Sequence, residues 1–172
     1  VNAEVSILVI NDASSQQIID TYPNLENIHS FEIINMKQNR GHARCNASGL
    51  KYIYEKKEFD YVIPMDGDGE DRPEELKNFI QLSEHAGDQS IVGERVKRSE
   101  GLFFQICYIF HKFLTLVFTG QTIKFGNFSC LSKVTIEKML KEKATWSSFS
   151  GSLRKVEKNL LSTPSTRGAR YF

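Results

Sequence analysis

Three carboxylates at alternate positions are the residues best placed to do chemistry in this 172-residue sequence. Asp66, Asp68 and Glu70 are separated by Gly67 and Gly69, which leave the backbone free to turn tightly. Neighbouring carboxylates repel one another unless a cation lies among them. Hard divalent ions such as Mg²⁺ and Mn²⁺ prefer oxygen ligands of this kind. The cluster therefore predicts a metal site, and a solvated acidic turn is the alternative.

The same spacing also opens like a calcium-binding EF-hand loop, but two later positions do not fit. The sixth position of such a loop needs Gly and holds Asp71. The twelfth needs Glu and holds Lys77. We therefore do not expect an EF-hand.

A strand must lead into the carboxylates and a helix must follow them. Residues 60–65 have the length and apolar composition of a buried strand. Asp71 is suited to cap a helix over residues 74–85, with Pro73 in its first turn. Because ligands of open α/β sheets bind at the carboxyl ends of the strands, we expect the carboxylates in such a crevice.

Strand-like and helix-like segments alternate along the first half of the chain, which predicts an α/β fold with a doubly wound, mostly parallel sheet. The expected strands are 5–10, 31–37, 60–65 and 90–93, and the expected helices are 43–57 and 74–85. The later part is expected to hold a short strand and turn at 124–133, a helix at 134–143, a Ser-rich loop at 146–152 and a last strand at 160–163.

Charge is distributed unevenly, although the net charge is only +1. Residues 1–94 carry 8 Lys and Arg against 17 Asp and Glu, and residues 95–172 carry 14 against 4. An acidic metal-binding half and a basic half suited to phosphates or anionic lipid would explain this, and chance clustering of solvated charges is the alternative. The three cysteines are widely spaced without a Cys-x-x-Cys pair, which indicates a reducing compartment and no zinc site.

The most apolar stretch, residues 102–118, follows a basic cluster formed by Arg95, Lys97 and Arg98. It contains a lysine and is marginal as a membrane span. A helix lying in a bilayer interface is one interpretation. A buried helix or a dimer face is the other.

Several short motifs occur in order along the chain. They are Ile10-Asn-Asp-Ala-Ser14, Asn39-x-Gly41 with Asn46 and Gly49, Asp66-x-Asp-x-Glu70 with Pro73, the segment Gly93 to Arg98, and the segment Gly126 to Lys133. Together they resemble the family-2 glycosyltransferases of the GT-A fold, especially dolichyl-phosphate mannose synthases and bacterial polyprenyl-phosphate sugar transferases. Departures from the family pattern fall at Asn11, Ala13, Gln16, Glu70 and Ser129, whereas Asp12 is kept.

The resemblance implies one glycosyltransferase domain over residues 1–172, with a Rossmann-like GT-A sheet. The family's first strand, central in that sheet, has no counterpart before Val5, and the family's closing Arg-x-x-Gly-x-Ser-Lys motif is not reached by residue 172. We therefore expect a fragment cut at both ends, weak or inactive by itself. Strands 5–10 and 60–65 should then either pair directly or leave a gap between them.

The resemblance also implies metal-dependent, inverting transfer of a sugar from a nucleoside-diphosphate sugar to a polyprenyl phosphate. The implied residues are Asp66, Asp68 and Arg95 for catalysis; Asp12, Arg40 and Asp66 for the donor; Asp66, Asp68 and Glu70 for Mg²⁺ or Mn²⁺; and Arg95, Lys97 and Arg98 for the acceptor phosphate. A sugar hydroxyl acceptor, which would need a carboxylate base, is the nearest alternative. A non-catalytic nucleotide- or membrane-binding module is another.

The expected location is the cytoplasmic face of a membrane. Residues 102–118 would contact the membrane surface, and transmembrane helices would follow in the full-length protein. A second copy of the chain is a further expected partner, and nucleic acid is not.

Overall fold

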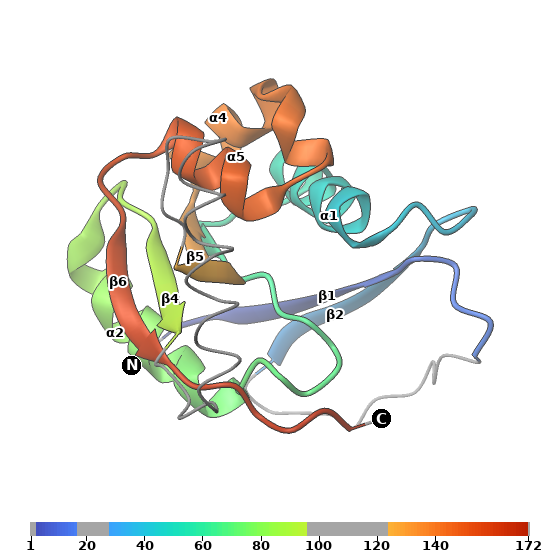
Figure 1. Cartoon of the computed structure of the whole chain (residues 1–172), viewed down its shortest axis with the longest axis horizontal. Coiled ribbons are helices and arrows are strands. Elements are labelled where there is room, and N and C mark those ends of the chain that lie inside the picture. The colour runs from blue at the N-terminus through green and yellow to red at the C-terminus, as the bar shows by residue number, and fades with distance from the viewer. Residues whose placement is uncertain (1–2, 17–27, 96–123, 172) are drawn as a thin grey trace, which may run out of the picture.

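The computed structural model describes residues 3–16, 28–95 and 124–171, whose arrangement is shown in Figure 1. Its strands and helices, with two short 3₁₀ helices marked η, are β1 (Val5–Asn11), β2 (Ile28–Asn35), α1 (His42–Lys56), β3 (Tyr61–Val62), η1 (Pro73–Glu75), α2 (Leu76–Ala86), β4 (Ile91–Arg95), β5 (Phe125–Ser132), α4 (Lys133–Lys141), η2 (Lys143–Trp146), α5 (Phe149–Val156) and β6 (Leu161–Ser165). Lys97, Arg98 and residues 102–118 lie outside the described residues, so what was expected of them stays a prediction. Among the helices in the described ranges, none is long and apolar enough to cross a membrane.

The strands form two separate sheets, and the larger one is mixed in direction. β1 and β2 pair in parallel. The larger sheet has the order β3-β5-β4-β6, in which β5 is antiparallel to both neighbours while β4 and β6 are parallel. The expectation of a mostly parallel sheet therefore needs correction, because β5 is inserted against the direction of the others. Alternation of elements could not reveal this, since residues 96–124 separate β5 from β4 and a connection of that length permits either direction.

The two sheets are joined through α1 rather than through strand pairing. In the described part of the chain, β1 pairs only with β2 and β3 only with β5, so of the two expected arrangements direct pairing is not found. Gly49 of α1 lies against β1 so closely that a Cβ atom there would be 3.0 Å from Cγ1 of Ile10. Leu50, the next residue, is buried in the core on the larger sheet. The absence of a side chain at Gly49 therefore allows close packing of α1 on β1.

Helices cover both faces of the larger sheet, and β5 supplies side chains to both cores (Figure 1). Successive residues of a strand point to opposite faces. Leu131 accordingly packs in the cluster that contains Ile136 of α4, whereas Phe128 and Cys130 pack with Phe79 of α2. The rings of Phe79 and Phe128 meet edge to face, with centroids 4.8 Å apart.

Two local predictions need correction. Residues 146–152, expected to be a loop, include the end of η2 and the start of α5. Ser148 caps α5 by accepting a hydrogen bond from the amide of Gly151 at 3.3 Å. Serine is unfavourable inside helices and favoured at their N-caps, so this serine cluster marks a helix start. The strand expected at 60–65 is reduced to Tyr61–Val62, because only these two residues pair with β5.

Candidate functional site

Residues 66–71, called the acidic loop below, follow the β3 segment and close on themselves. The carboxylate of Asp71 accepts a hydrogen bond from the amide of Asp66 at 2.8 Å. Gly69 has a φ of 85°, which residues with a Cβ atom rarely adopt. Asp71 thus fastens the loop and does not cap α2, which begins only at Leu76, so that part of the helix prediction is wrong. Burial raises the pKa of the Asp71 carboxyl.

The first residue of α1 lies directly on the acidic loop. Nε2 of His42 is 2.9 Å from Oδ1 of Asp66. The side-chain amide nitrogens of Asn46 and Asn127 lie 3.0 and 3.2 Å from the same Nε2. The helix α1, the strand β5 and the loop therefore meet at one imidazole. The sequence argument did not single out His42. Its place directly after the Asn39-x-Gly41 motif, at the start of a helix, was the available signal.

Asp12 at the end of β1 holds the turn that leads into α1. Its two carboxylate oxygens accept hydrogen bonds from the amides of Arg40 and Gly41, each at 2.8 Å. Gly41 has a φ of 83°, so the turn depends on glycine at that position. Asp12 and Arg40 are thus brought together as neighbours, and this turn sets the position of His42 over the acidic loop. Their expected contacts with a nucleotide sugar stay predictions.

Residues 166–171, called the strap below, follow β6 and lie beside the acidic loop, where Figure 1 shows the red C-terminal segment next to the green loop. Nε of Arg170 is 3.2 Å from a carboxylate oxygen of both Asp68 and Glu70. The guanidinium of Arg167 donates a second bond to Glu70. The sequence argument assigned these two arginines no role, although the basic second half of the chain was a general sign of them.

Arg95, at the end of β4, is brought to the same place as the acidic loop. It lines a small pocket with Asp66, Asp71 and Arg167. Partial burial and the neighbouring Arg167 lower the pKa of its guanidinium, and the loop carboxylates oppose that shift. The fold therefore places Arg95 and Asp66 at one pocket, and their expected roles in catalysis stay predictions.

The chemistry of the acidic loop fits a hard divalent ion in one form only. In the described ranges, no three side chains of His, Cys, Asp or Glu converge as a ligand set. Magnesium is usually held by one or two carboxylates together with substrate phosphates. Asp66 and Asp68 supply carboxylates of that kind, although Asp68 also contacts Arg170. Glu70 is bound to both strap arginines. A site of two carboxylates completed by a diphosphate is the arrangement that these residues fit.

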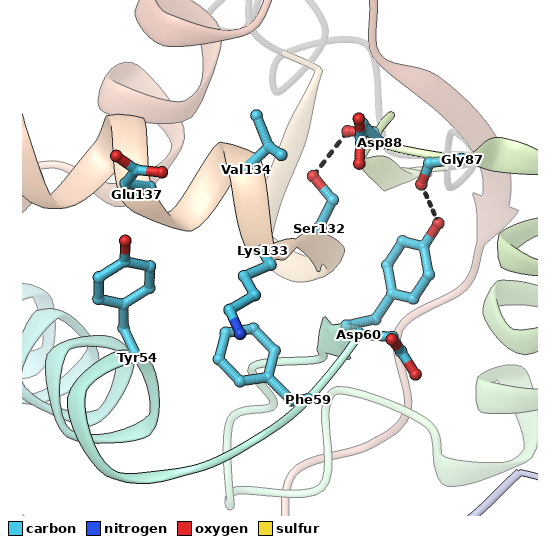
Figure 2. Close-up of a pocket in the computed structure, with 10 residues that line it drawn as sticks. Tyr54, Phe59, Asp60, Gly87, Asp88, Ser132, Lys133, Val134 and Glu137 are labelled. Carbon is cyan, nitrogen blue, oxygen red and sulfur yellow. Dashed lines mark hydrogen bonds between the residues drawn. The ribbon is translucent and has the colours of Figure 1, made fainter.

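A cavity of about 540 Å³ lies elsewhere (Figure 2). It is lined by aromatic and acidic side chains at the start of β3, among them Phe59 and Asp60, whereas the acidic loop follows the end of that segment. Figure 2 shows Lys133 reaching over the ring of Phe59, with its Nζ 5.4 Å from the ring centroid. None of the residues predicted for the site lines this cavity, so cavity size does not locate the candidate site.

This mixed α/β fold with carboxylates after a strand is consistent with a GT-A domain, and comparison of sequences defines the family. Residues 2–149 match the model of glycosyl transferase family 2, and the chain belongs to that family. A relative in Methanocaldococcus jannaschii, the uncharacterized protein MJ0544, is 23% identical over 145 residues. The matched region is 80% of this chain and 63% of that relative, so the chain spans less than two thirds of the relative's length.

Proposed function

We propose that the protein transfers a sugar from a nucleoside-diphosphate sugar at the acidic loop, with Mg²⁺ or Mn²⁺. The observation that carries the proposal is the meeting of Asp66, His42 and Arg95 at the carboxyl end of the β3 segment. Membership of glycosyl transferase family 2 supports sugar transfer as the reaction class. The place of the loop after a strand of an α/β sheet supports a nucleotide crevice there.

In this proposal each described residue has a separate task. Asp66 and Asp68 would hold the ion, which neutralises negative charge on the diphosphate leaving group. Asp12 fixes the turn at Arg40 and Gly41, whose backbone forms the wall of the donor site nearest β1. Arg95, carried on a strand end and therefore firmly placed, binds a phosphate group by charge-assisted hydrogen bonds.

The acceptor in this proposal is a polyprenyl phosphate at the cytoplasmic face of a membrane. The support is the basic character of residues 95–172 and the apolar stretch 102–118 next to Arg95, Lys97 and Arg98. A lipid phosphate is already an anionic nucleophile at neutral pH, so no general base is needed. Transfer to a sugar hydroxyl is the second candidate. It is favoured only by the contact between His42 and Asp66, because this pair could accept the proton of the acceptor hydroxyl.

The test is transfer of radiolabelled sugar by the full-length protein from a panel of nucleoside-diphosphate sugars. Undecaprenyl phosphate and soluble oligosaccharides are offered as separate acceptors. We expect label in the lipid fraction, abolished by excess chelator. Asp68→Asn should reduce turnover at least about 100-fold, because it weakens electrostatic stabilisation of the leaving group.

Asp88→Asn is the matched control, because Asp88 is exposed and lies in the large cavity away from the acidic loop. It should leave turnover unchanged. If label appears in oligosaccharide only, the acceptor is a sugar hydroxyl and not a lipid phosphate. Full activity in excess chelator would refute the metal dependence of the transfer.

A further inference from the structure

The strap is aligned along the acidic loop by its backbone. The amide of Gly168 donates to the carbonyl oxygen of Glu70 at 2.8 Å, and the amide of Tyr171 donates to that of Asp68 at 3.0 Å. The two segments therefore run in opposite directions, side by side. Such paired backbone bonds fix the register of the strap and bring the same side chains together each time it is seated.

This register puts two guanidinium groups on two carboxylates. Arg170 contacts both Asp68 and Glu70, and Arg167 contacts Glu70. The side chains of Asp68 and Glu70 are consequently only 24% and 16% exposed, although they belong to a surface loop. Their negative charge is balanced by the chain's own arginines.

Glycines allow the two backbones to approach this closely. A Cβ atom at Gly168 would lie 2.4 Å from the carbonyl oxygen of Gly69, closer than real contacts allow. A Cβ atom at Gly69 would lie 2.6 Å from the ring of Tyr171. Seating of the strap thus depends on the absence of a methyl group at each of two positions.

Thr166 anchors the other end of the strap. Its amide and its hydroxyl both donate to the carboxylate of Glu75, at 2.9 and 2.8 Å. Hydrogen bonding to Thr166 and Ser165 lowers the pKa of Glu75 against the opposing effect of its burial. Residues after this anchor can therefore leave the acidic loop while Thr166 stays bound.

We propose that the strap is an autoinhibitory gate on the acidic loop, in which Arg170 competes with a divalent cation for Asp68 while both strap arginines hold the strap on Glu70. The inference rests on the metal site of the proposed function. A cation bound to these carboxylates would lie within a few ångströms of the guanidinium groups and be repelled by them. The ion therefore binds with full affinity only when residues 167–171 leave the loop. When the strap is seated, the loop is in a closed state, in which its carboxylates contact arginines instead of a cation.

The test measures Mn²⁺ alone, without nucleotide, by the electron paramagnetic resonance signal of the free ion. Arg170→Gln should bind Mn²⁺ about two- to fivefold more tightly than the wild type, the range expected for losing an exposed competing ion pair. Arg170→Lys, which keeps the charge, should stay close to the wild type. Arg154→Gln removes a guanidinium of α5 that donates to the carbonyl of Lys158, and as a matched control it should change nothing.

A second variant unseats the strap without changing any charge. Gly168→Ala should also tighten Mn²⁺ binding, because its methyl group cannot fit beside Gly69. In the same variant, trypsin should cut after Arg167 faster than in the wild type, as followed by mass spectrometry. Added Mn²⁺ should accelerate this cut in the wild type, because it displaces the strap.

The possible failures are distinguishable. Equal Mn²⁺ affinity in the wild type, Arg170→Gln and Gly168→Ala would overturn the gate and leave the proposed metal site standing. A second failure is tighter Mn²⁺ binding in Arg170→Gln alone, with Gly168→Ala as resistant to trypsin as the wild type. The change in affinity would then come only from the lost charge of Arg170, and the gate would also be overturned. Absence of Mn²⁺ binding in all variants, both alone and with a nucleoside diphosphate added, would overturn the metal site and the gate together.

Discussion

Cys130 shows how the core of the larger sheet responds to pH at the scale of one residue. It is 1% exposed, and burial raises the pKa of its thiol from the ordinary 9.0 to about 12. Between these two values the unfolded thiol is ionised while the folded thiol keeps its proton. The unfolded state then binds fewer protons, so the free energy of unfolding falls as pH rises.

Cys130→Ala should remove this component of the pH dependence. From pH 7 to pH 10 the free energy of unfolding of the wild type should fall by about 1.4 kcal/mol more than that of the variant. Urea unfolding at both pH values measures the difference. Parallel pH profiles for the two proteins would show that Cys130 does not ionise on unfolding in this range. Tyr61, whose pKa is raised by burial and also by the charge of Cys130, remains in both proteins, and only its burial effect cancels in the comparison.

Ala13 occupies a backbone conformation that suits glycine. Its φ is 54°, in the left-handed region, at the position where the family motif has Gly. Ala13→Gly should therefore raise the free energy of unfolding slightly, by about 0.5 kcal/mol, because relief of strain outweighs the extra chain entropy. Ala43→Gly in α1 is the control and should lower it by about 1 kcal/mol. A loss of the same size at both positions would argue against strain at Ala13.

The N-cap of α5 makes a prediction at the scale of one element. Ser148→Ala removes the acceptor for the amide of Gly151 and should cost about 1 kcal/mol of stability. Ser147→Ala, one residue earlier, removes only an exposed hydroxyl that donates to the carbonyl of Ala144, and should cost less than about 0.5 kcal/mol. Chemical denaturation distinguishes them. Equal losses in the two variants would mean that Ser148 does not cap the helix.

Sequence reasoning predicted most elements that local patterns specify, but it missed α5, whose start the local cap at Ser148 marks. Periodicity predicted α1, and the apolar run before Asp66 predicted the strand that carries the acidic loop. The His42 contact and the strap were not predicted. They join residues 24 and about 100 positions apart, and their geometry depends on how β6 and α1 pack rather than on any local pattern. The direction of β5 escaped prediction for the same reason.

At the scale of the whole molecule, the two sheets should differ in local stability. β4 and β5 contribute fully buried residues to the two cores, whereas every residue of β1 is only partly buried or exposed. Apart from its pairing with β2, β1 packs on the described chain chiefly through α1. Regions with few buried contacts open at lower free energy than the core.

Hydrogen exchange followed by mass spectrometry should therefore show earlier exchange in peptides from β1 and β2 than in those from β4 and β5. Protection should be greatest around Leu131, which is fully buried. Uniform protection across both sheets would indicate one cooperative unit.

The long sequence separation between the acidic loop and the strap affects the order of events during synthesis. The ion pairs of Glu70 reach residues 97 and 100 positions further along the chain. At ordinary translation rates the ribosome needs about 5–20 s to add that many residues. Throughout this interval the nascent loop presents its carboxylates to cellular cations without the two strap arginines. A newly made molecule thus passes through the open form of the loop before it can adopt the closed one.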